Sequence, residues 1–338
     1  TPKPSSAASD VYKRQHHMIK FIIKRLLALI PVLIGVSLLV FFILDLAPGD
    51  PAKAALGEQA RPEDIEAFRE EMGLNDPFII RYVNYMLGLC HGDLGTSYKT
   101  LDPVGEEVWA RLPNTAILAL TSTVVAILLA LPLGIIAAIK QNTLFDGISM
   151  FVSLIGISMP VFWMGLLLIL LFSVKLGWFP VSGADQGIKS LVLPSVTLGF
   201  MHMAAIARTT RSSMLETIRQ DYIRTVRAKG LPEREVITRH ALRNALIPTT
   251  TVIGLQIGGM LGGSVLTESV FAWPGIGRYM IQSIQGRDIP SVMGCIIIFA
   301  LSFAVINLIV DLIYGFIDPR IKACLLYTSP SPRDRSLS

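Results

Sequence analysis

The chain has 338 residues, of which 52% are hydrophobic and only 16% are charged, and its formal net charge is +5. Soluble domains usually carry about 25% charged residues, and disordered chains combine low hydrophobicity with high charge. The composition therefore excludes disorder and indicates a membrane protein. A basic pI of about 9.1 does not indicate nucleic-acid binding, because that needs Lys and Arg clustered on a well-charged surface.

The two ends of the chain differ in composition from the rest. Residues 1–17 are polar and aperiodic, and residues 324–338 are rich in Ser, Pro and Arg. The first of these flanks has no apolar stretch of the kind found in a signal peptide. We expect both flanks to be non-native, with genuine disordered tails as the alternative. Residues 18–323 then contain 25 basic and 23 acidic residues, a net charge of +2.

Six stretches of 18 to 28 residues contain no Asp, Glu, Lys or Arg. A helix needs about 20 apolar residues to cross the hydrocarbon core of a bilayer. The pattern predicts an all-α integral membrane protein with six transmembrane helices and disfavours a soluble all-α protein. The stretches are residues 26–44, 112–139, 147–174, 190–207, 244–267 and 289–310.

The basic residues predict the orientation of these spans. Lys20, Lys24 and Arg25 precede the first span, which places the N-terminus in the cytoplasm. Six spans then return the C-terminus to the same side. In this orientation the cytoplasmic segments hold 15 Lys and Arg against 6 acidic residues, and the external segments hold 10 against 16.

The spans divide the chain into segments. The predicted segments are an N-terminal tail with the first span (18–46), an external segment (47–111), a domain of five spans (112–317) and a cytoplasmic C-terminus (318–323). The external segment contains a predicted helix at about 62–72. Pro62 suits the first position of a helix, and Gly73 suits its end.

A basic cytoplasmic loop lies at residues 208–247, within the domain of five spans. We expect a short helix from Tyr222 to Lys229, capped by Asp221 and ended by Gly230 in a left-handed conformation. A second helix is expected from Pro232 to about Ala245. The apolar residues expected to project from the loop are Tyr222, Val226 and Leu231. Docking in a groove on a partner and lying on the membrane surface both explain such a loop.

The chain lacks the usual motifs of catalysis. It has no nucleotide-binding Gly-x-x-x-x-Gly-Lys, no His-Glu-x-x-His, no Gly-x-Ser-x-Gly and no Cys-x-x-Cys. His202 fits a pore or packing residue better than a metal ligand. Ionisable residues in spans are functional by default, but we expect Asp45 and Glu268 to be solvated at the external face, which leaves Asp311 inside the last span. We therefore predict no catalytic, cofactor or metal site.

The cytoplasmic loop resembles the signature of ABC importer permeases, Glu-Ala-Ala-x-x-x-Gly followed later by Ile-x-Leu-Pro. Gly230 stands at the signature glycine and Leu242 at the later leucine. Arg224, Thr225 and Val226 replace Glu-Ala-Ala, while His240 and Arg243 replace the isoleucine and proline. These departures are typical of the peptide/nickel branch, which has Arg-Ala-Lys-Gly (227–230) and Arg-His-Ala-Leu-Arg-Asn-Ala (239–245).

Other motifs support this branch. They are the first span and its exit (24–52), HGDLGTS (91–97), SMPVFWMG (158–165) and ESVFAWPGIGRY (268–279). The resemblance covers residues 18–323, and the long external segment is similar to that of the B-type permease subunit. It implies a type I, MetI-like permease fold with an extracytoplasmic segment after the first span, in a prokaryotic inner membrane.

The resemblance also implies partners and a mechanism. These are a second homologous permease, two cytoplasmic ATPase subunits that bind the ATP, and an extracytoplasmic solute-binding protein, with no nucleic acid. The chain would be a transport subunit without a cofactor, and would import peptides by alternating access. Nickel chelates, glutathione or sugars are alternative cargoes. An exporter, a receptor-like protein and an intramembrane enzyme are the competing classes.

Three groups of residues are candidates for function. The residues expected to couple to the ATPase are Asp221, Tyr222, Arg227, Ala228, Lys229, Gly230, Leu231, His240, Arg243 and Asn244. A small-residue stripe of Gly254, Gly258 and Gly262 allows close helix packing, with a contact inside the chain favoured over one with the partner permease. Candidate residues of the translocation pathway are Gln256, Thr267 and Glu268.

Overall fold

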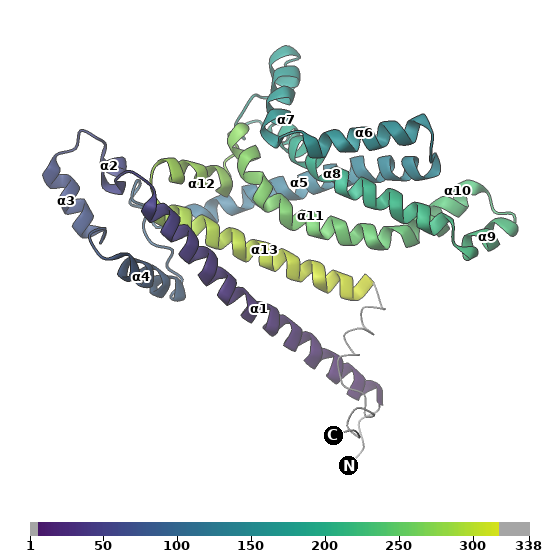
Figure 1. The fold of residues 1–338 in the computed structure, drawn as a ribbon, viewed down its shortest axis with the longest axis horizontal. Coiled ribbons are helices and arrows are strands. Elements are labelled where there is room, and N and C mark those ends of the chain that lie inside the picture. Colours follow the sequence, from purple (N-terminus) through teal and green to yellow (C-terminus); the bar gives the residue numbers. More distant parts are fainter. Residues whose placement is uncertain (1–5, 318–338) are drawn as a thin grey trace. The chain divides into compact units, whose positions relative to one another are not determined.

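The computed structural model describes residues 6–317, and these residues form helices joined by turns and loops, without β-strands. The chain divides into two compact units. The first unit comprises the residues up to Ala110 together with Met280–Leu308, and the second comprises Arg111–Tyr279 and the residues from Ile309 onward. Figure 1 labels the helices of both units.

The first unit holds one long apolar helix and a group of short ones. Its helices are α1 (Ser6–Leu46), α2 (Pro51–Leu56), α3 (Pro62–Glu71), α4 (Phe78–Cys90) and most of α13 (Ile289–Ile317). Residues 6–17, part of the flank that we expect to be non-native, are helical and belong to α1. The flank 324–338 and the tail 318–323 lie outside the described residues.

The helix expected at 62–72 is confirmed as α3. It begins at Pro62 and carries Glu63 in its first turn, and Gly73 follows it with φ +63°. Glutamate near a helix N-terminus is favourable because it faces the positive end of the helix dipole. Ile65 and Phe68 of α3 pack on Ala52 of α2 and form a small buried cluster.

The second unit contains the remaining helices. They are α5 (Val104–Ile139), α6 (Leu144–Ser158), α7 (Val161–Leu168), the π-helical η1 (Ile169–Lys175), α8 (Ile188–Ile218), α9 (Asp221–Ala228), α10 (Glu233–Glu235), the π-helical η2 (Val236–Ala241), α11 (Leu242–Val270) and the start of α12 (Ile276–Gln285), whose residues from Met280 onward belong to the first unit. The helices α5, α12 and α13 run across the division between the units.

Helix α8 is the centre of the second unit. It packs against α6, α7 and α11 and lies between α6 and α11 (Figure 1). Three glycines allow backbones to touch there. An added Cβ would come 2.6 Å from the Ala207 carbonyl at Gly134, 2.8 Å from the Phe200 carbonyl at Gly156 and 2.7 Å from the Ser122 carbonyl at Gly199. Only a residue without a Cβ fits such contacts.

The predicted spans are largely confirmed. Within the part of the chain that the structure describes, five helices are long and apolar enough to cross a membrane: α1, α5, α8, α13 and the helix Glu233–Val270. The third predicted span, 147–174, is not one straight helix. The segment Leu144–Lys175 bends by 108° between α6 and α7, because Pro160 forces Met159 into an extended conformation (φ −88°, ψ 125°). Six spans result when this bent pair is counted as one.

Two helices extend further than predicted. Helix α8 continues to Ile218, so its last three turns occupy the start of the expected cytoplasmic loop. The second helix of that loop does not end near Ala245. Segments α10, η2 and α11 follow one another directly and form one helix from Glu233 to Val270. The second helix of the expected loop and the fifth predicted span are therefore parts of one element.

We predict that Gly199→Ala lowers the thermal stability of the protein in detergent. The added methyl group would overlap the Ser122 carbonyl, and such overpacking costs about 1–3 kcal/mol. Gly147→Ala is the matched control, because no described atom lies within 4 Å of its added Cβ. Equal melting temperatures for the two variants would contradict the close contact of α5 and α8.

Candidate functional site

The short helix expected in the cytoplasmic loop is present as α9, from Asp221 to Ala228. Gly230 follows it with φ +80°, as predicted. The predicted cap was wrong by one residue. Gln220 is the N-cap and makes no side-chain capping hydrogen bond, while Asp221 is the first helical residue. There its carboxylate faces the helix dipole favourably.

One face of α9 packs against the ends of α5, α8 and α11. Ile223 is completely buried and belongs to a cluster with Met214 of α8 and Ala245 of α11. Val226 and Leu231 pack against the same cluster. Our expectation that these two residues project outward was wrong, because burying them stabilises α9. Sequence analysis missed Ile223, although its spacing of three from Val226 is helical.

The outward face of this region is polar. Tyr222 is 40% exposed, and its hydroxyl accepts a hydrogen bond from the Asn244 side chain at 2.7 Å. Arg227 donates two hydrogen bonds to Glu233, which raises the pKa of Arg227. These contacts join α9 to the helix that becomes α11.

The ten predicted coupling residues lie in one region, on α9, the turn after it and the first turns of Glu233–Val270. The exposed ones are Asp221, Tyr222, Arg227, Ala228, Lys229, Gly230, Arg243 and Asn244, and the half-buried ones are Leu231 and His240.

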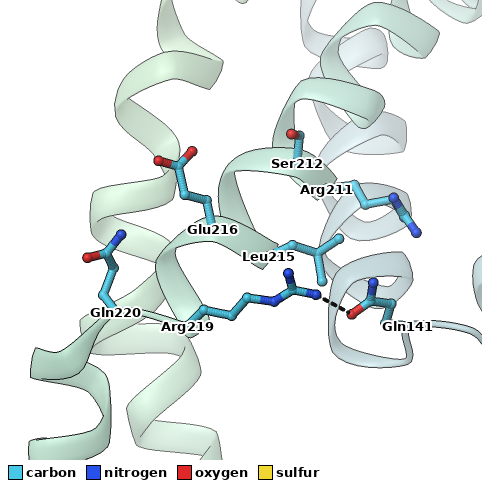
Figure 2. A pocket seen from close by; sticks show the side chains of 7 residues that line it. All are labelled: Gln141, Arg211, Ser212, Leu215, Glu216, Arg219 and Gln220. Atoms are coloured by element: carbon cyan, nitrogen blue, oxygen red, sulfur yellow. Dashed lines mark hydrogen bonds between the residues drawn. The ribbon is translucent and has the colours of Figure 1, made fainter.

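A hollow of about 480 Å³ adjoins this region. It is lined by Gln141 after α5 and by the last turns of α8 (Figure 2). Arg219 points across it and donates a hydrogen bond to Gln141 at 3.2 Å. Arg211 on its rim donates two hydrogen bonds of 2.8 Å to the buried carboxylate of Asp146 in α6. Sequence analysis did not indicate this hollow, because its walls come from separate helices.

The predicted glycine stripe of α11 is only partly used within the chain. Gly254 and Gly258 are buried, but Gly262 is exposed, and no described atom lies within 4 Å of a Cβ added there. The expected contact inside the chain is therefore wrong at Gly262. A Cβ added at Gly259 or at Gly263 would come 3.6 Å from the His202 ring, so α8 approaches α11 on the side of these two glycines.

The three candidate pathway residues have different surroundings. Gln256 is half-buried, and its amide donates a hydrogen bond to the His202 carbonyl at 3.4 Å. Thr267 is buried, and its hydroxyl has no hydrogen-bond partner among the described residues. Glu268 is completely buried. Our expectation that it is solvated at the external face was wrong, because the loop after α11 folds over it.

The segment 268–279 encloses the Glu268 carboxylate. One carboxylate oxygen accepts a hydrogen bond from the Thr115 hydroxyl at 2.8 Å, and the other accepts one from the Arg278 amide at 3.1 Å. Gly275 lies so close that an added Cβ would come 2.4 Å from the carboxylate. The Arg278 guanidinium donates to the Ala272 carbonyl. Backbone and hydroxyl donors therefore hold this carboxylate.

Two further bonds hold the same loop to α5. The Trp273 indole donates to the Asn114 carbonyl at 3.0 Å, and the Asn114 amide donates to the Pro274 carbonyl at 2.9 Å. Sequence analysis recognised the motif ESVFAWPGIGRY but not its role as an enclosure. Its partners Asn114 and Thr115 come from α5, far away in the sequence.

Among the side chains that the structure describes, which lie within residues 22–312, no group of His, Cys, Asp and Glu could hold a metal ion. The second unit has two distinctive regions. One is the helix α9, which lies between two spans and exposes a polar face, and the other is the segment 268–279, which encloses the Glu268 carboxylate.

Two protein-family models match the chain. The family described as binding-protein-dependent transport system inner membrane component matches residues 130–323, and the N-terminal part of such membrane components matches residues 18–119. The chain belongs to this family of transport permeases. It is therefore the permease subunit of an ABC importer, a multi-pass component of the inner membrane and not an enzyme, and the ATPase is a separate subunit.

Individual relatives agree with the family. The dipeptide transport system permease protein DppB of Alkalihalophilus pseudofirmus is 47% identical, over 90% of this chain and 100% of the relative. The glutathione transport system permease protein GsiC of Escherichia coli K12 is 44% identical, over 90% of this chain and 99% of the relative.

Solved structures agree with the fold. The MetNI methionine ABC transporter in inward-facing conformations matches with a TM-score of 0.53 at 16% identity, over 62% of this chain and 96% of that chain. An amino acid ABC transporter with histidines matches with a TM-score of 0.50 at 14% identity, over 62% of this chain and 94% of that chain. The permease has the MetI-like fold.

We predict that Glu268→Ala lowers the melting temperature of the purified permease strongly. The substitution leaves the Thr115 hydroxyl and the Arg278 amide without their acceptor, and each unpaired buried donor costs about 1–3 kcal/mol. Glu216→Ala is the control, since this exposed carboxylate makes no comparable contacts and surface substitutions change stability by about 0.5 kcal/mol or less. Similar melting curves for both variants would show that Glu268 does not hold the loop.

Proposed function

We propose that this permease imports dipeptides or other small peptides. The support is its similarity, over nearly its whole length, to a relative named for dipeptide transport and to one named for glutathione transport. Glutathione is itself a small peptide, so the two names describe one class of cargo. Nickel chelates and sugars are the other cargoes to test.

The proposed assembly contains a second homologous permease, two cytoplasmic ATPase subunits that bind ATP, and an extracytoplasmic solute-binding protein. The support is the binding-protein-dependent family itself. The basic residues Lys20, Lys24 and Arg25 support cytoplasmic termini. In this orientation α9 faces the ATPase, and the enclosed Glu268 loop faces the binding protein.

The observation that carries the coupling proposal is the attachment of α9. A helix lying on the membrane surface needs an apolar face directed at lipid. In α9 the apolar residues Ile223 and Val226 are turned inward onto α8 and α11. Its exposed face is polar, with Arg224 and Thr225. This favours docking in a groove of the ATPase over lying on the membrane.

Because α9 is packed onto the longer helices, it would move with them as one rigid body. Closure of the ATPase pair would move α9 together with the ends of α5, α8 and α11, whose residues form its buried cluster. The spans would then shift between inward- and outward-open states, a change of population driven by ATP. Gln256 and Thr267 are the proposed pathway residues on α11. Glu268 would act by holding the loop above them.

Replacing Gly230 tests this coupling. A left-handed backbone costs a residue with a side chain about 1–2 kcal/mol, and no described atom lies within 4 Å of a Cβ added at Gly230. Gly230→Val should therefore change the turn alone. We expect the complex to remain in the membrane and to hydrolyse ATP, while uptake per ATP falls about tenfold.

The matched control is Gly230→Asn, because asparagine tolerates left-handed conformations better than valine does. It should retain most of the uptake. Both activities are measured in proteoliposomes that contain the full complex. Normal transport by the Gly230→Val complex would refute the role of this turn.

Cargo is tested in the same proteoliposomes with the cognate binding protein. We expect ATP-dependent accumulation of a labelled dipeptide, and competition by unlabelled dipeptides but not by sugars. Accumulation of a nickel chelate or a sugar without peptide competition would overturn the peptide assignment.

A further inference from the structure

The helix α4 exposes an apolar face that the transport mechanism does not use. Four of its side chains are strongly exposed: Ile79 (67%), Ile80 (48%), Val83 (46%) and Leu87 (55%). At 3.6 residues per turn these positions share one side of the helix, and the exposed Cys90 falls on the same side. Uncovered apolar patches of this kind mark contact surfaces.

The opposite face of α4 is pinned to α1. The Tyr82 hydroxyl shares a hydrogen bond with the Ser37 hydroxyl at 2.9 Å. The ring of Phe41 makes T-shaped contacts with those of Phe78 and Tyr82, at centroid distances of 5.4 and 5.6 Å. Tyr85 contacts the same ring. The side of α4 that contacts α1 is therefore settled, and the apolar side points away from α1.

These contacts place α4 at membrane depth. The apolar part of α1 runs from Leu27 to Leu46, so Phe41 lies about 7.5 Å inside its end and Ser37 about 13.5 Å inside, at 1.5 Å per residue. Ile289 and Met293 of α13 complete the cluster around Phe41. They lie in the first turns of another membrane span. Helix α4 thus packs on two spans. Its contacts lie deeper in the membrane than Leu46, where α1 ends.

The charge distribution agrees with this depth. Arg81 is the single charged residue of α4, and it donates a 2.7 Å hydrogen bond to Asp45, next to the last residue of α1. Arginine side chains inside a membrane extend their charged end toward the interface, and Arg81 does so toward the end of α1. Helix α3, in the same external segment, has exposed acidic residues such as Glu63 and Glu70 instead. The exposed side of α3 therefore suits water, and the exposed side of α4 suits lipid.

We propose that α4 is a half-membrane helix whose exposed face lies among the acyl chains of the leaflet in which α1 ends. With 13 residues it is too short to span the bilayer, but as a helix it satisfies its own backbone in lipid. This proposal depends on the membrane placement of α1 and α13 and not on the cargo or the ATPase coupling.

The chain that follows α4 is held to the first unit by hydrogen bonds, although residues 91–93 and 99–103 are exposed. Asp288, before α13, accepts hydrogen bonds from the Ser97 hydroxyl and the Tyr98 amide. The Val104 amide donates to the Gly95 carbonyl. The returning segment 94–103 is thus bonded within the first unit.

The test uses the full chain in its assembled complex in lipid nanodiscs. Cys90 and Cys324 are replaced by Ser, and the buried Cys295 is retained. Nitroxide labels on Val83→Cys and on Leu87→Cys should be more accessible to oxygen, which concentrates in acyl chains, than to a water-soluble nickel complex. A label on Ala67→Cys, at an exposed position of α3, should show the reverse.

Two results would overturn the proposal. Preferential access of the nickel complex to both α4 labels would place this face in water. Low access of both reagents would mean that a protein partner, such as the solute-binding protein or the second permease, covers it.

A charge substitution gives a second measurement. Val83 is exposed, so Val83→Glu removes little packing within the chain. We expect it to lower the melting temperature of the complex in nanodiscs, because a carboxylate at this depth would have to leave water. Ala67→Glu on α3 should have no such effect. Unchanged melting of the Val83→Glu complex would contradict a lipid-facing α4.

Discussion

Backbone contact around α8 is the interaction on which the second unit depends. Lipid tails are as apolar as leucine, so helices gain little from the hydrophobic effect inside a membrane and must pack closely instead. Gly134, Gly156 and Gly199 remove the side chains that would separate α8 from α5 and α6. The end of α8 then provides Met214, onto which α9 is fastened through Ile223. The position of α9 therefore follows from the packing of the spans.

The helix Glu233–Val270 connects the two distinctive regions of this unit. It is 38 residues long, about 57 Å at 1.5 Å per residue. Its first turns carry His240, Arg243 and Asn244 beside α9, and its last turn carries Glu268 beneath the closed loop. In the proposed mechanism, force applied at the cytoplasmic end reaches the external loop through one continuous element.

The structure and the comparisons corrected the sequence-based predictions at particular residues. The family, the apolar spans, the helix α3 and the left-handed Gly230 were confirmed. Val226 and Leu231 turned inward, Gly262 lacked the expected contact within the chain, and Glu268 was buried. Each of these corrections concerns which neighbour covers a residue: a cluster beside α9 covers Val226 and Leu231, and a loop covers Glu268. A period of 3.6 residues identifies the faces of a helix, but it does not say what will cover them.

The sequence by itself determined the class of the protein. Long uncharged stretches have one physical solution in a bilayer, a helix that satisfies its own backbone, and motifs in fixed order identified the family. Only the tertiary structure decided where polar groups find partners. Glu268 meets Thr115, Asp146 meets Arg211 and Asp288 meets Ser97, each more than 60 positions away. Buried polar groups need partners, but the fold alone chooses which residues supply them.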